Sequence, residues 1–233
     1  DELTVTVDKA KLAELEAESI DIIRQTAGQF DRPALLFSGG KDSVLVLELA
    51  KRAFAPAPVP LELLHVDTGH NFPEVIEFRD RLVERTGARL RVAAVQDWID
   101  RGVLKERADG TRNPLQTVPL VETIADDYPV DRSRIFATGF SNGGGFVAYL
   151  SCQLPATFHA VAPVGAAYYE ATHESCAEEA VARLDIHGTH DKVIGYHGGM
   201  RHGERYDSVQ GVLEGVARRN GCERSTMTRN GQH

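Results

Sequence analysis

Residues 38–43 read Ser-Gly-Gly-Lys-Asp-Ser, and they directly follow the short apolar run Pro-Ala-Leu-Leu-Phe at 33–37. This pattern predicts a buried strand, then a glycine-rich turn, then a helix that begins near Lys41. Such a turn points several backbone N–H groups into one concavity at the positive end of a helix, where a phosphate group fits. Gly39 and Gly40 allow close approach and unusual backbone angles. We therefore interpret 38–43 as a phosphate-binding loop, and not as a surface turn that merely tolerates glycine.

The loop is not a Walker A motif, because it lacks the spacing Gly-x-x-x-x-Gly-Lys-Ser/Thr. It resembles the PP-loop of ATP pyrophosphatases, which split ATP between its α and β phosphates. Two later segments, 63–80 and 111–117, resemble parts of the small, ATP-binding subunit of bacterial sulfate adenylyltransferase. The resemblance runs from about Leu12 to Leu120, so we predict a PP-loop ATP-binding part over residues 1–120.

This resemblance implies a nucleotide site in which ATP is the substrate and Mg²⁺ bridges its phosphate oxygens. The residues expected to hold the β and γ phosphates are Ser38, Gly39, Gly40, Lys41, Asp42 and Ser43. The residues expected to lie close to the nucleotide, at the end of the next strand and the same edge of the sheet, are Asp67, Thr68 and Gly69. A sulfate oxygen would attack the α phosphate, pyrophosphate would leave, and a GTPase large subunit would be the partner.

Three further features bear on this reading. Arg112 lies in the polar segment 106–113, where it could face the anionic substrates or simply be solvated. No cysteine precedes Cys152, which disfavours the thiol-dependent sulfonucleotide reductases that share the PP-loop. The resemblance also stops before the family's later basic and aromatic motifs, so truncation could impair adenylyl transfer.

A second motif follows at residues 134–144, where a strand pattern runs into Gly-Phe-Ser-Asn-Gly with Ser141 at its centre. Gly-x-Ser-x-Gly marks a sharp strand-to-helix turn that lifts the serine hydroxyl above a sheet. The turn is expected to require glycine at positions 139 and 143, because backbone packs against backbone there and leaves no room for a side chain. The region from about 124 to 222 resembles polyhydroxybutyrate depolymerases and feruloyl esterases, so we predict a partial α/β-hydrolase part over residues 121–233.

The hydrolase resemblance implies Ser141 as the nucleophile and Asp191 as the acid that orients a histidine. The order Ser, Asp, His requires a histidine after Asp191, and the candidates are His197, His202 and His233. His197 lies too close to Asp191 in the sequence, and His233 lies in a polar tail without the Gly-His-x-Trp surroundings of the family. A serine without a base is a poor nucleophile at neutral pH, so an inert Ser141 is the favoured interpretation.

The composition limits the class of protein. A chain of 233 residues with 42% hydrophobic residues can bury a sizeable core, and a net charge of −8 argues against nucleic acid as a partner. We expect a cytoplasmic protein without a membrane span or a signal peptide. Cys152, Cys176 and Cys222 all lie in the second part, either with one bridge among them or as three inert thiols.

Apolar strands that alternate with helices indicate an α/β fold with a parallel, doubly wound sheet. Strands are expected at 34–37, 61–66, 89–95, 134–138, 159–163 and 183–187. We predict one continuous six-stranded sheet of order 3-2-1-4-5-6, in which Ser38 and Ser141 lie at neighbouring strand ends.

Three functions remain open from the sequence. The first is an ATP-binding PP-loop protein of the sulfate adenylyltransferase type, which the dominant motif favours. The second is a serine esterase or depolymerase that uses Ser141. The third is a non-catalytic fusion of two partial enzymes. No pattern of residues predicts a resident metal ion.

Overall fold

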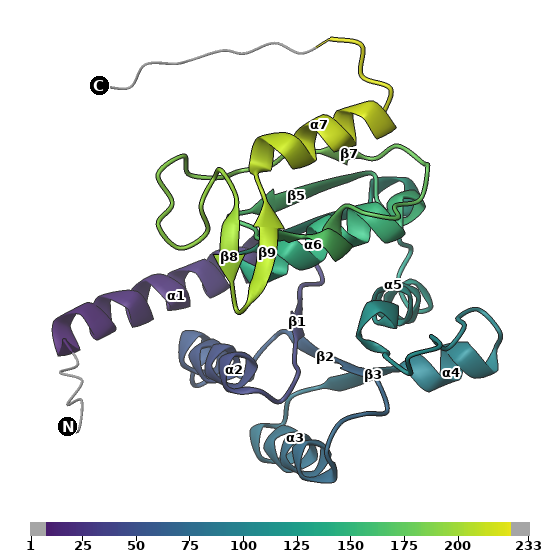
Figure 1. The fold of residues 1–233 in the computed structure, drawn as a ribbon. Coiled ribbons are helices and arrows are strands. Elements are labelled where there is room, and N and C mark those ends of the chain that lie inside the picture. The colour runs from purple at the N-terminus through teal and green to yellow at the C-terminus, as the bar shows by residue number, and fades with distance from the viewer. Residues whose placement is uncertain (1–7, 225–233) are drawn as a thin grey trace. The chain divides into compact units, whose positions relative to one another are not determined.

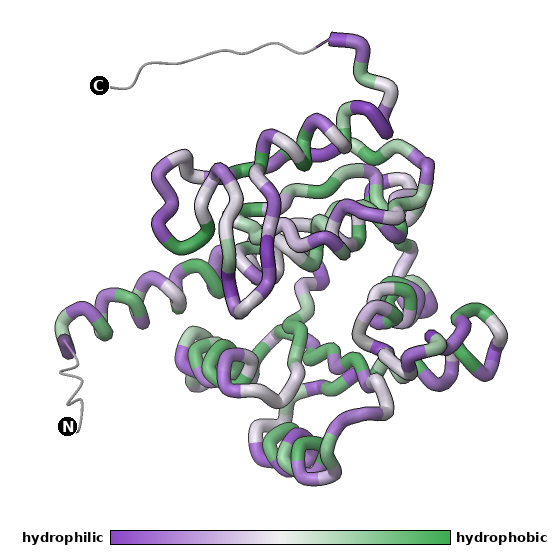
Figure 2. Tube along the Cα trace, in the orientation of Figure 1, coloured by the Kyte–Doolittle hydropathy of each residue, from purple (hydrophilic) through white to green (hydrophobic). Residues whose placement is uncertain are grey.

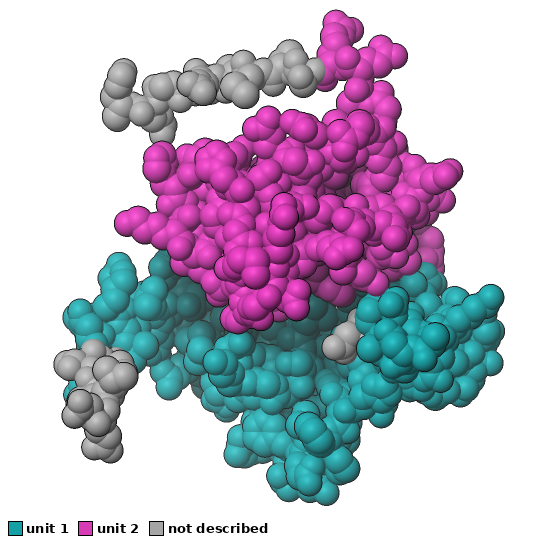
Figure 3. Space-filling model, viewed as in Figure 1, with its two compact units in different colours: residues 1–129 teal, residues 130–233 magenta. Residues whose placement is uncertain are grey.

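The computed structural model describes residues 8–224, apart from the side chain of Asn113, so His233 lies outside the described residues. The chain divides into two compact units, residues 1–129 and residues 130–233 (Figure 3). Each unit has its own sheets and its own hydrophobic core, and each is described by itself.

The first unit contains a parallel sheet of order β1-β2-β3 (Figure 1). Its strands are β1 (Ala34–Leu36), β2 (Glu62–Asp67) and β3 (Leu90–Ala94). Its α-helices are α1 (Lys9–Gln29), α2 (Lys41–Phe54), α3 (Pro73–Thr86), α4 (Val95–Asp100) and α5 (Thr117–Ala125). A short 3-10 helix covers Asn113–Leu115. The strands expected at 34–37, 61–66 and 89–95 and the helix expected to begin near Lys41 are thus present, with strand bounds shifted by no more than one residue.

Apolar spacing and end signals explain these elements. Leu47 of α2 and Leu82 of α3 pack with Phe37 and Leu63 to form the core of this unit. Helix α3 begins with a proline, which suits a first helical position, and ends at Gly87, whose φ of 65° gives a left-handed cap. Helix α1 lies along α2 and buries none of its residues.

The second unit contains a parallel sheet of order β4-β5-β7 and an antiparallel sheet of order β6-β9-β8. The parallel strands are β4 (Phe136–Phe140), β5 (Ala160–Val164) and β7 (Ala182–Arg183). The antiparallel strands, which the sequence did not predict, are β6 (Tyr168–Tyr169), β8 (Gly199–Arg201) and β9 (Glu204–Asp207). The helices are α6 (Asn142–Gln153), α7 (Val209–Arg219) and the 3-10 turns Arg132–Arg134, Pro155–Thr157 and Glu170–Thr172.

Helices α6 and α7 close the core of the second unit. Val147 and Leu150 of α6 pack with Val161 of β5, and Val209 and Val212 of α7 pack against Ala148 and Tyr168. A disulfide joins Cys152 to Cys176, whereas Cys222 is free and exposed. Strands β4 and β5 are largely hydrophobic and β9 is hydrophilic, while α1 alternates between hydrophobic and hydrophilic residues (Figure 2).

The α/β class is confirmed, but the predicted single six-stranded sheet is wrong. Strand β1 pairs with β2 and β4 pairs with β5, and no pairing joins β1 to β4. Apolar patterning marks both segments as strands but does not encode their partners, and each segment completes a separate local sheet. Leu36 remains 58% exposed and Phe140 75% exposed. The predicted adjacency of Ser38 and Ser141 rested on that pairing, and it loses its support.

Within the described part of the chain, no helix combines the length and the apolar character that crossing a bilayer requires.

Candidate functional site

The glycine-rich loop follows β1 as the sequence predicts. Phe37 is buried at the end of the strand, and Gly39 takes a φ of 78°, which glycine adopts without strain. Gly40 is the N-cap of α2 and offers no side chain to the helix, so no side-chain cap occupies the first N–H groups of α2. These donors remain available for an anion.

Two serines support the loop from within. The Ser38 hydroxyl accepts from the Gly40 backbone N–H at 3.3 Å and lies 3.3 Å from the Ser43 hydroxyl, which donates to the Gly40 carbonyl at 2.9 Å. Lys41 and Asp42 are exposed. Among the described residues Lys41 forms no ion pair, so its ammonium group is free to meet an anionic ligand.

The second predicted segment, residues 67–69, forms a turn at the end of β2. The Asp67 carboxylate accepts from the Gly69 backbone N–H at 2.8 Å and from the Asn71 amide at 3.3 Å. Thr68 is buried, and its hydroxyl accepts from the backbone N–H of His70 at 3.2 Å. Because β1 and β2 are parallel neighbours, this turn and the glycine-rich loop share one edge of the sheet, as expected.

His65 connects the two strands beneath this edge. Its Nδ1 lies 2.8 Å from the Phe37 carbonyl oxygen, which can only accept, so Nδ1 carries the proton. The ring is buried, and its Nε2 has no hydrogen-bond partner among the described residues. His65 therefore belongs to the core under the loop, and does not face the ligand edge.

Arg112 reaches the same edge from the polar loop before α5. Its Nη1 donates to the Thr68 carbonyl at 3.0 Å, and its Nη2 donates to the Gln96 side chain at 2.8 Å and to the Glu106 carboxylate at 2.7 Å. The side chain is only 12% exposed. The alternative that Arg112 is simply solvated is therefore wrong. No local pattern in the sequence could have shown this contact.

Ser141 has the conformation expected of a serine elbow. It lies between β4 and α6 with φ 55° and ψ −116°, values that a non-glycine residue rarely adopts. A Cβ at Gly139 would lie 2.4 Å from the Gly143 carbonyl oxygen, so backbone does pack against backbone there. A Cβ at Gly143 would meet open space, whereas one at Gly144 would lie 2.8 Å from the Val164 carbonyl oxygen. The position that must be small on the helix side is thus Gly144.

The Asp191 carboxylate accepts hydrogen bonds from the backbone of its own turn. One carboxylate oxygen accepts from the backbone N–H groups of Val193 at 2.8 Å and Ile194 at 3.0 Å. The bonds from Ile194 and then Val193 lower the pKa of Asp191 below its usual value. The nearest ring nitrogen is Nε2 of His187, 3.8 Å from the other carboxylate oxygen, and it donates instead to the Ile194 carbonyl at 2.9 Å.

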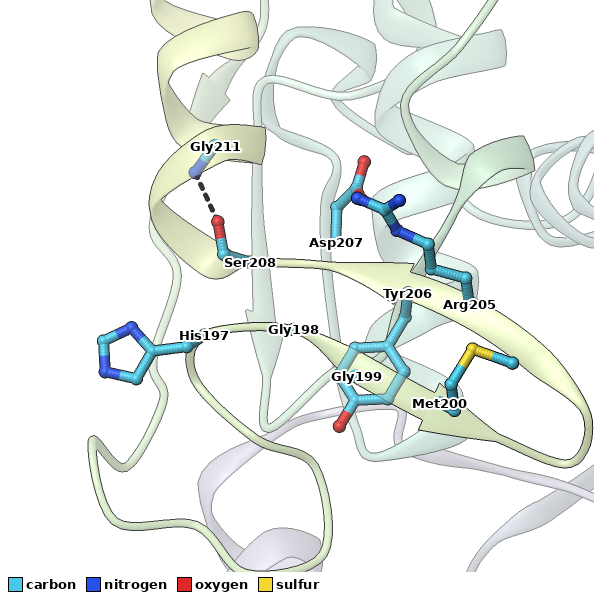
Figure 4. A pocket seen from close by; sticks show the side chains of 9 residues that line it. All are labelled: His197, Gly198, Gly199, Met200, Arg205, Tyr206, Asp207, Ser208 and Gly211. Carbon is cyan, nitrogen blue, oxygen red and sulfur yellow. Dashed lines mark hydrogen bonds and ion pairs between the residues drawn. The ribbon is translucent and has the colours of Figure 1, made fainter.

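No histidine in the described part of the chain bonds to the Ser141 hydroxyl. His197 is exposed beside a shallow pocket of about 530 Å³ at β8 and β9, and its ring points away from Tyr206 (Figure 4). His202 lies at the tip of the β8–β9 hairpin, and His233 lies outside the described residues. Among the described residues, no histidine therefore links the Ser141 hydroxyl to the Asp191 carboxylate.

Residues 32–128 match the family described as the phosphoadenosine phosphosulfate reductase domain. The chain is 67% identical over 110 residues to sulfate adenylyltransferase subunit 2 of Streptomyces lavendulae, covering 47% of this chain and 34% of the relative. It is 57% identical over 113 residues to the same subunit of Mycobacterium sp. (strain KMS), covering 48% of this chain and 36% of the relative. The N-terminal half is thus similar in sequence to sulfate adenylyltransferase subunit 2.

The chain spans about a third of the length of these curated relatives. The similarity lies in the N-terminal half, and the hydrolase resemblance has no support from these matches. A solved NH3-dependent NAD synthetase from Campylobacter jejuni matches with a TM-score of 0.38 at 20% identity, over 48% of this chain and 52% of that one. That similarity is too low to bear on function.

Proposed function

We propose that the first unit binds ATP in the manner of a sulfate adenylyltransferase small subunit. The observation that carries the proposal is the glycine-rich loop before α2, whose N-terminus has no side-chain cap, next to the Asp67–Gly69 turn at the same sheet edge. The 67% identity to a sulfate adenylyltransferase subunit supports this choice of ligand.

The loop residues have separate roles in this proposal. The backbone N–H groups at the start of α2 bind the β and γ phosphates, and Lys41 adds a positive charge. The hydroxyls of Ser38 and Ser43 keep the loop in shape through their bonds to the Gly40 backbone. Residues 67–69 border the nucleotide, and Asp67 keeps one carboxylate oxygen free of hydrogen bonds among the described residues.

Mg²⁺ fits this edge as a companion of the nucleotide. The described residues contain no cluster of three or more His, Cys, Asp or Glu side chains that could hold a metal ion. Mg²⁺ commonly binds through substrate phosphates plus one or two carboxylates, and it would neutralise phosphate charge when bound. The free oxygen of Asp67 is a hard ligand of the required kind.

The reaction that follows is the transfer of the adenylyl group of ATP to sulfate, which releases pyrophosphate. A sulfate oxygen would attack the α phosphate, and the chain would contribute chiefly by positioning ATP and stabilising its charge. A GTPase large subunit is the proposed partner. The matched segment has no cysteine, which favours adenylyl transfer over thiol-dependent reduction.

Calorimetric titration with ATP and Mg²⁺ tests the proposal. Lys41→Ala should weaken binding by roughly tenfold, because it removes a charge-assisted contact to phosphate. Lys51→Ala is the matched control, since Lys51 lies on the same helix and pairs with Glu48 at 2.9 Å. Equal ATP affinity in the parent and in Lys41→Ala, or no binding by the parent, would refute the assignment.

A second candidate is a serine hydrolase in the second unit. The elbow conformation of Ser141 favours it, and the absence of a histidine contact among the described residues opposes it. An assay with a p-nitrophenyl ester tests it, and turnover lost in Ser141→Ala would support it. We place this candidate behind ATP binding.

A further inference from the structure

A groove in the second unit runs along α7 and encloses about 480 Å³. One wall is the segment from Thr172 to Glu178, which the disulfide between Cys152 and Cys176 ties to α6. The other wall is α7, and Arg218 and Arg219 lie at its C-terminal end. This groove belongs to neither of the sites described above.

Arg219 is the unusual residue in this groove. Its Nε and Nη2 are inaccessible to solvent and have no hydrogen-bond partner among the described residues. Burial first, and then repulsion from Arg183, lower the pKa of the Arg219 guanidinium. An arginine stays charged in proteins, so the positive charge persists, and no carboxylate of the described residues forms an ion pair with it. The side chain as a whole is half-buried, and two of its nitrogens have lost water without gaining a partner among the described residues, so an anion bound to the guanidinium would offset part of that cost.

The neighbouring arginine does not share this deficit. Arg183 forms two bonds of 2.8 Å with the Asp185 carboxylate, and both side chains are almost fully buried. Asp185 also accepts a hydrogen bond from the Tyr168 hydroxyl. The Asp185 carboxylate thus neutralises the charge of Arg183. Because Asp185 already binds both Arg183 and Tyr168, it does not pair with Arg219.

The acidic residues of the groove leave Arg219 unpaired. Asp207 is 3.1 Å from the His173 ring and 3.5 Å from Arg205, and it precedes the N-terminal end of α7. Among the described residues, Glu174 and Glu178 form no ion pair with Arg218 or Arg219. Residues 225–233 contain no Asp or Glu, so their side chains cannot supply the missing charge.

We propose that the C-terminal end of this groove binds a small oxyanion, a phosphate or carboxylate group, with Arg219 as its principal ligand. Arg218, which is exposed, would add a weaker contact at the rim. The groove is larger than one such group, so it has room for the rest of a phosphoester or a carboxylic acid. Asn220, the residue after Arg219, is held in place by the hydrogen bond from its side-chain amide to the Val181 carbonyl at 2.8 Å.

Thermal unfolding of the full chain with increasing inorganic phosphate, and separately with acetate, tests this proposal. An anion that binds only the folded state raises the unfolding temperature. The increase should persist in Lys41→Ala, which removes the charge of the glycine-rich loop. With Lys41→Ala as the background, so that the loop does not respond, it should be lost on adding Arg219→Gln, whose affinity should fall by roughly tenfold or more, and largely kept on adding Arg218→Gln. A response to both anions indicates a general oxyanion site. A response to only one shows whether the ligand group is a phosphate or a carboxylate.

A second measurement uses the unaltered protein, which covers the case in which Arg219→Gln does not fold. The Nε–H resonance of Arg219 should shift in NMR spectra as phosphate or acetate is added, and should saturate. An increase in unfolding temperature that is equal in Arg219→Gln, equally lost in Arg218→Gln, or lost in Lys41→Ala would overturn the proposal. So would an Arg219 resonance that responds to neither anion.

Discussion

Arg112 donates from Nη1 to the carbonyl oxygen of Thr68 at 3.0 Å, which connects the loop before α5 to the turn after β2. The same guanidinium contacts Gln96 and Glu106, so its planar set of donors spans three separate segments. A Cβ at Gly69 would lie 2.8 Å from Nη1, so glycine leaves the room that this contact needs. Arg112 therefore fixes the position of the turn that we place beside the nucleotide.

Replacing Arg112 should weaken ATP binding even when the positive charge is kept. Arg112→Lys retains the charge but cannot reach three acceptors with one planar group, so we expect a loss of roughly tenfold in affinity. Titration calorimetry with ATP and Mg²⁺ measures it. Arg107→Lys is the control, because Arg107 lies in the same loop and is exposed, and its guanidinium forms an ion pair with Asp109 at 3.4 Å and with no other described residue. Full affinity in Arg112→Lys would show that the turn does not depend on this contact.

The two glycines of the loop should respond differently to substitution. Gly40 has φ −78°, and a Cβ there would lie 3.4 Å from the Ser38 hydroxyl, so Gly40→Val should fold but block the approach of phosphate. Gly39 has φ 78°, and a Cβ there would lie 3.2 Å from Val75, so Gly39→Ala should lower the free energy of unfolding by about 1–2 kcal/mol.

Denaturant unfolding and ATP titration of both variants check this pair of expectations. A Gly40→Val protein that binds ATP as tightly as the parent would contradict the phosphate-binding role of the loop. A Gly39→Ala protein of unchanged stability would contradict the strain argument alone.

Local features of the first unit could be predicted from sequence, whereas long-range pairing could not. The apolar run at 33–37 and the glycine-rich loop after it are clear signals, since each depends on neighbouring residues alone. The partner of a strand and the 44-residue separation between Thr68 and Arg112 leave no local pattern. Strand β6 has only two residues, Tyr168 and Tyr169, which is too short for periodicity to reveal.

The disulfide should stabilise the second unit without affecting ATP binding. Cys152 and Cys176 are separated by 24 positions, and a loop of this size stabilises by about 3 kcal/mol through restriction of the unfolded chain. Reduction should therefore lower the unfolding temperature of that unit. Cys152→Ser should reproduce the effect, and Cys222→Ser should not, because Cys222 is free and exposed. Equal unfolding curves before and after reduction would refute the prediction that the disulfide stabilises the second unit.

Asp191 should contribute a pH-dependent stability at acidic pH. Its folded-state pKa is lowered, chiefly by the bonds from the Ile194 and Val193 backbone N–H groups. A lowered folded pKa gives stability that is present above the unfolded value of about 3.9 and is lost as pH falls through the folded value. Asp191→Asn should flatten this part of the stability curve. NMR titration of the Asp191 carboxyl should give a pKa below that of an exposed aspartate, and an ordinary value would contradict the turn geometry.

Ser141 should react slowly with a fluorophosphonate probe despite its elbow conformation. The positive φ lifts the residue onto a sharp turn, but a serine hydroxyl needs a base to become nucleophilic, and no histidine of the described residues reaches it. Loss of a triad member leaves only residual catalysis in serine hydrolases. Mass spectrometry of labelled protein over time measures the rate, with Ser141→Ala as the control. Rapid, stoichiometric labelling that disappears in Ser141→Ala would mean that a histidine completes the site, and the second unit would then be an esterase.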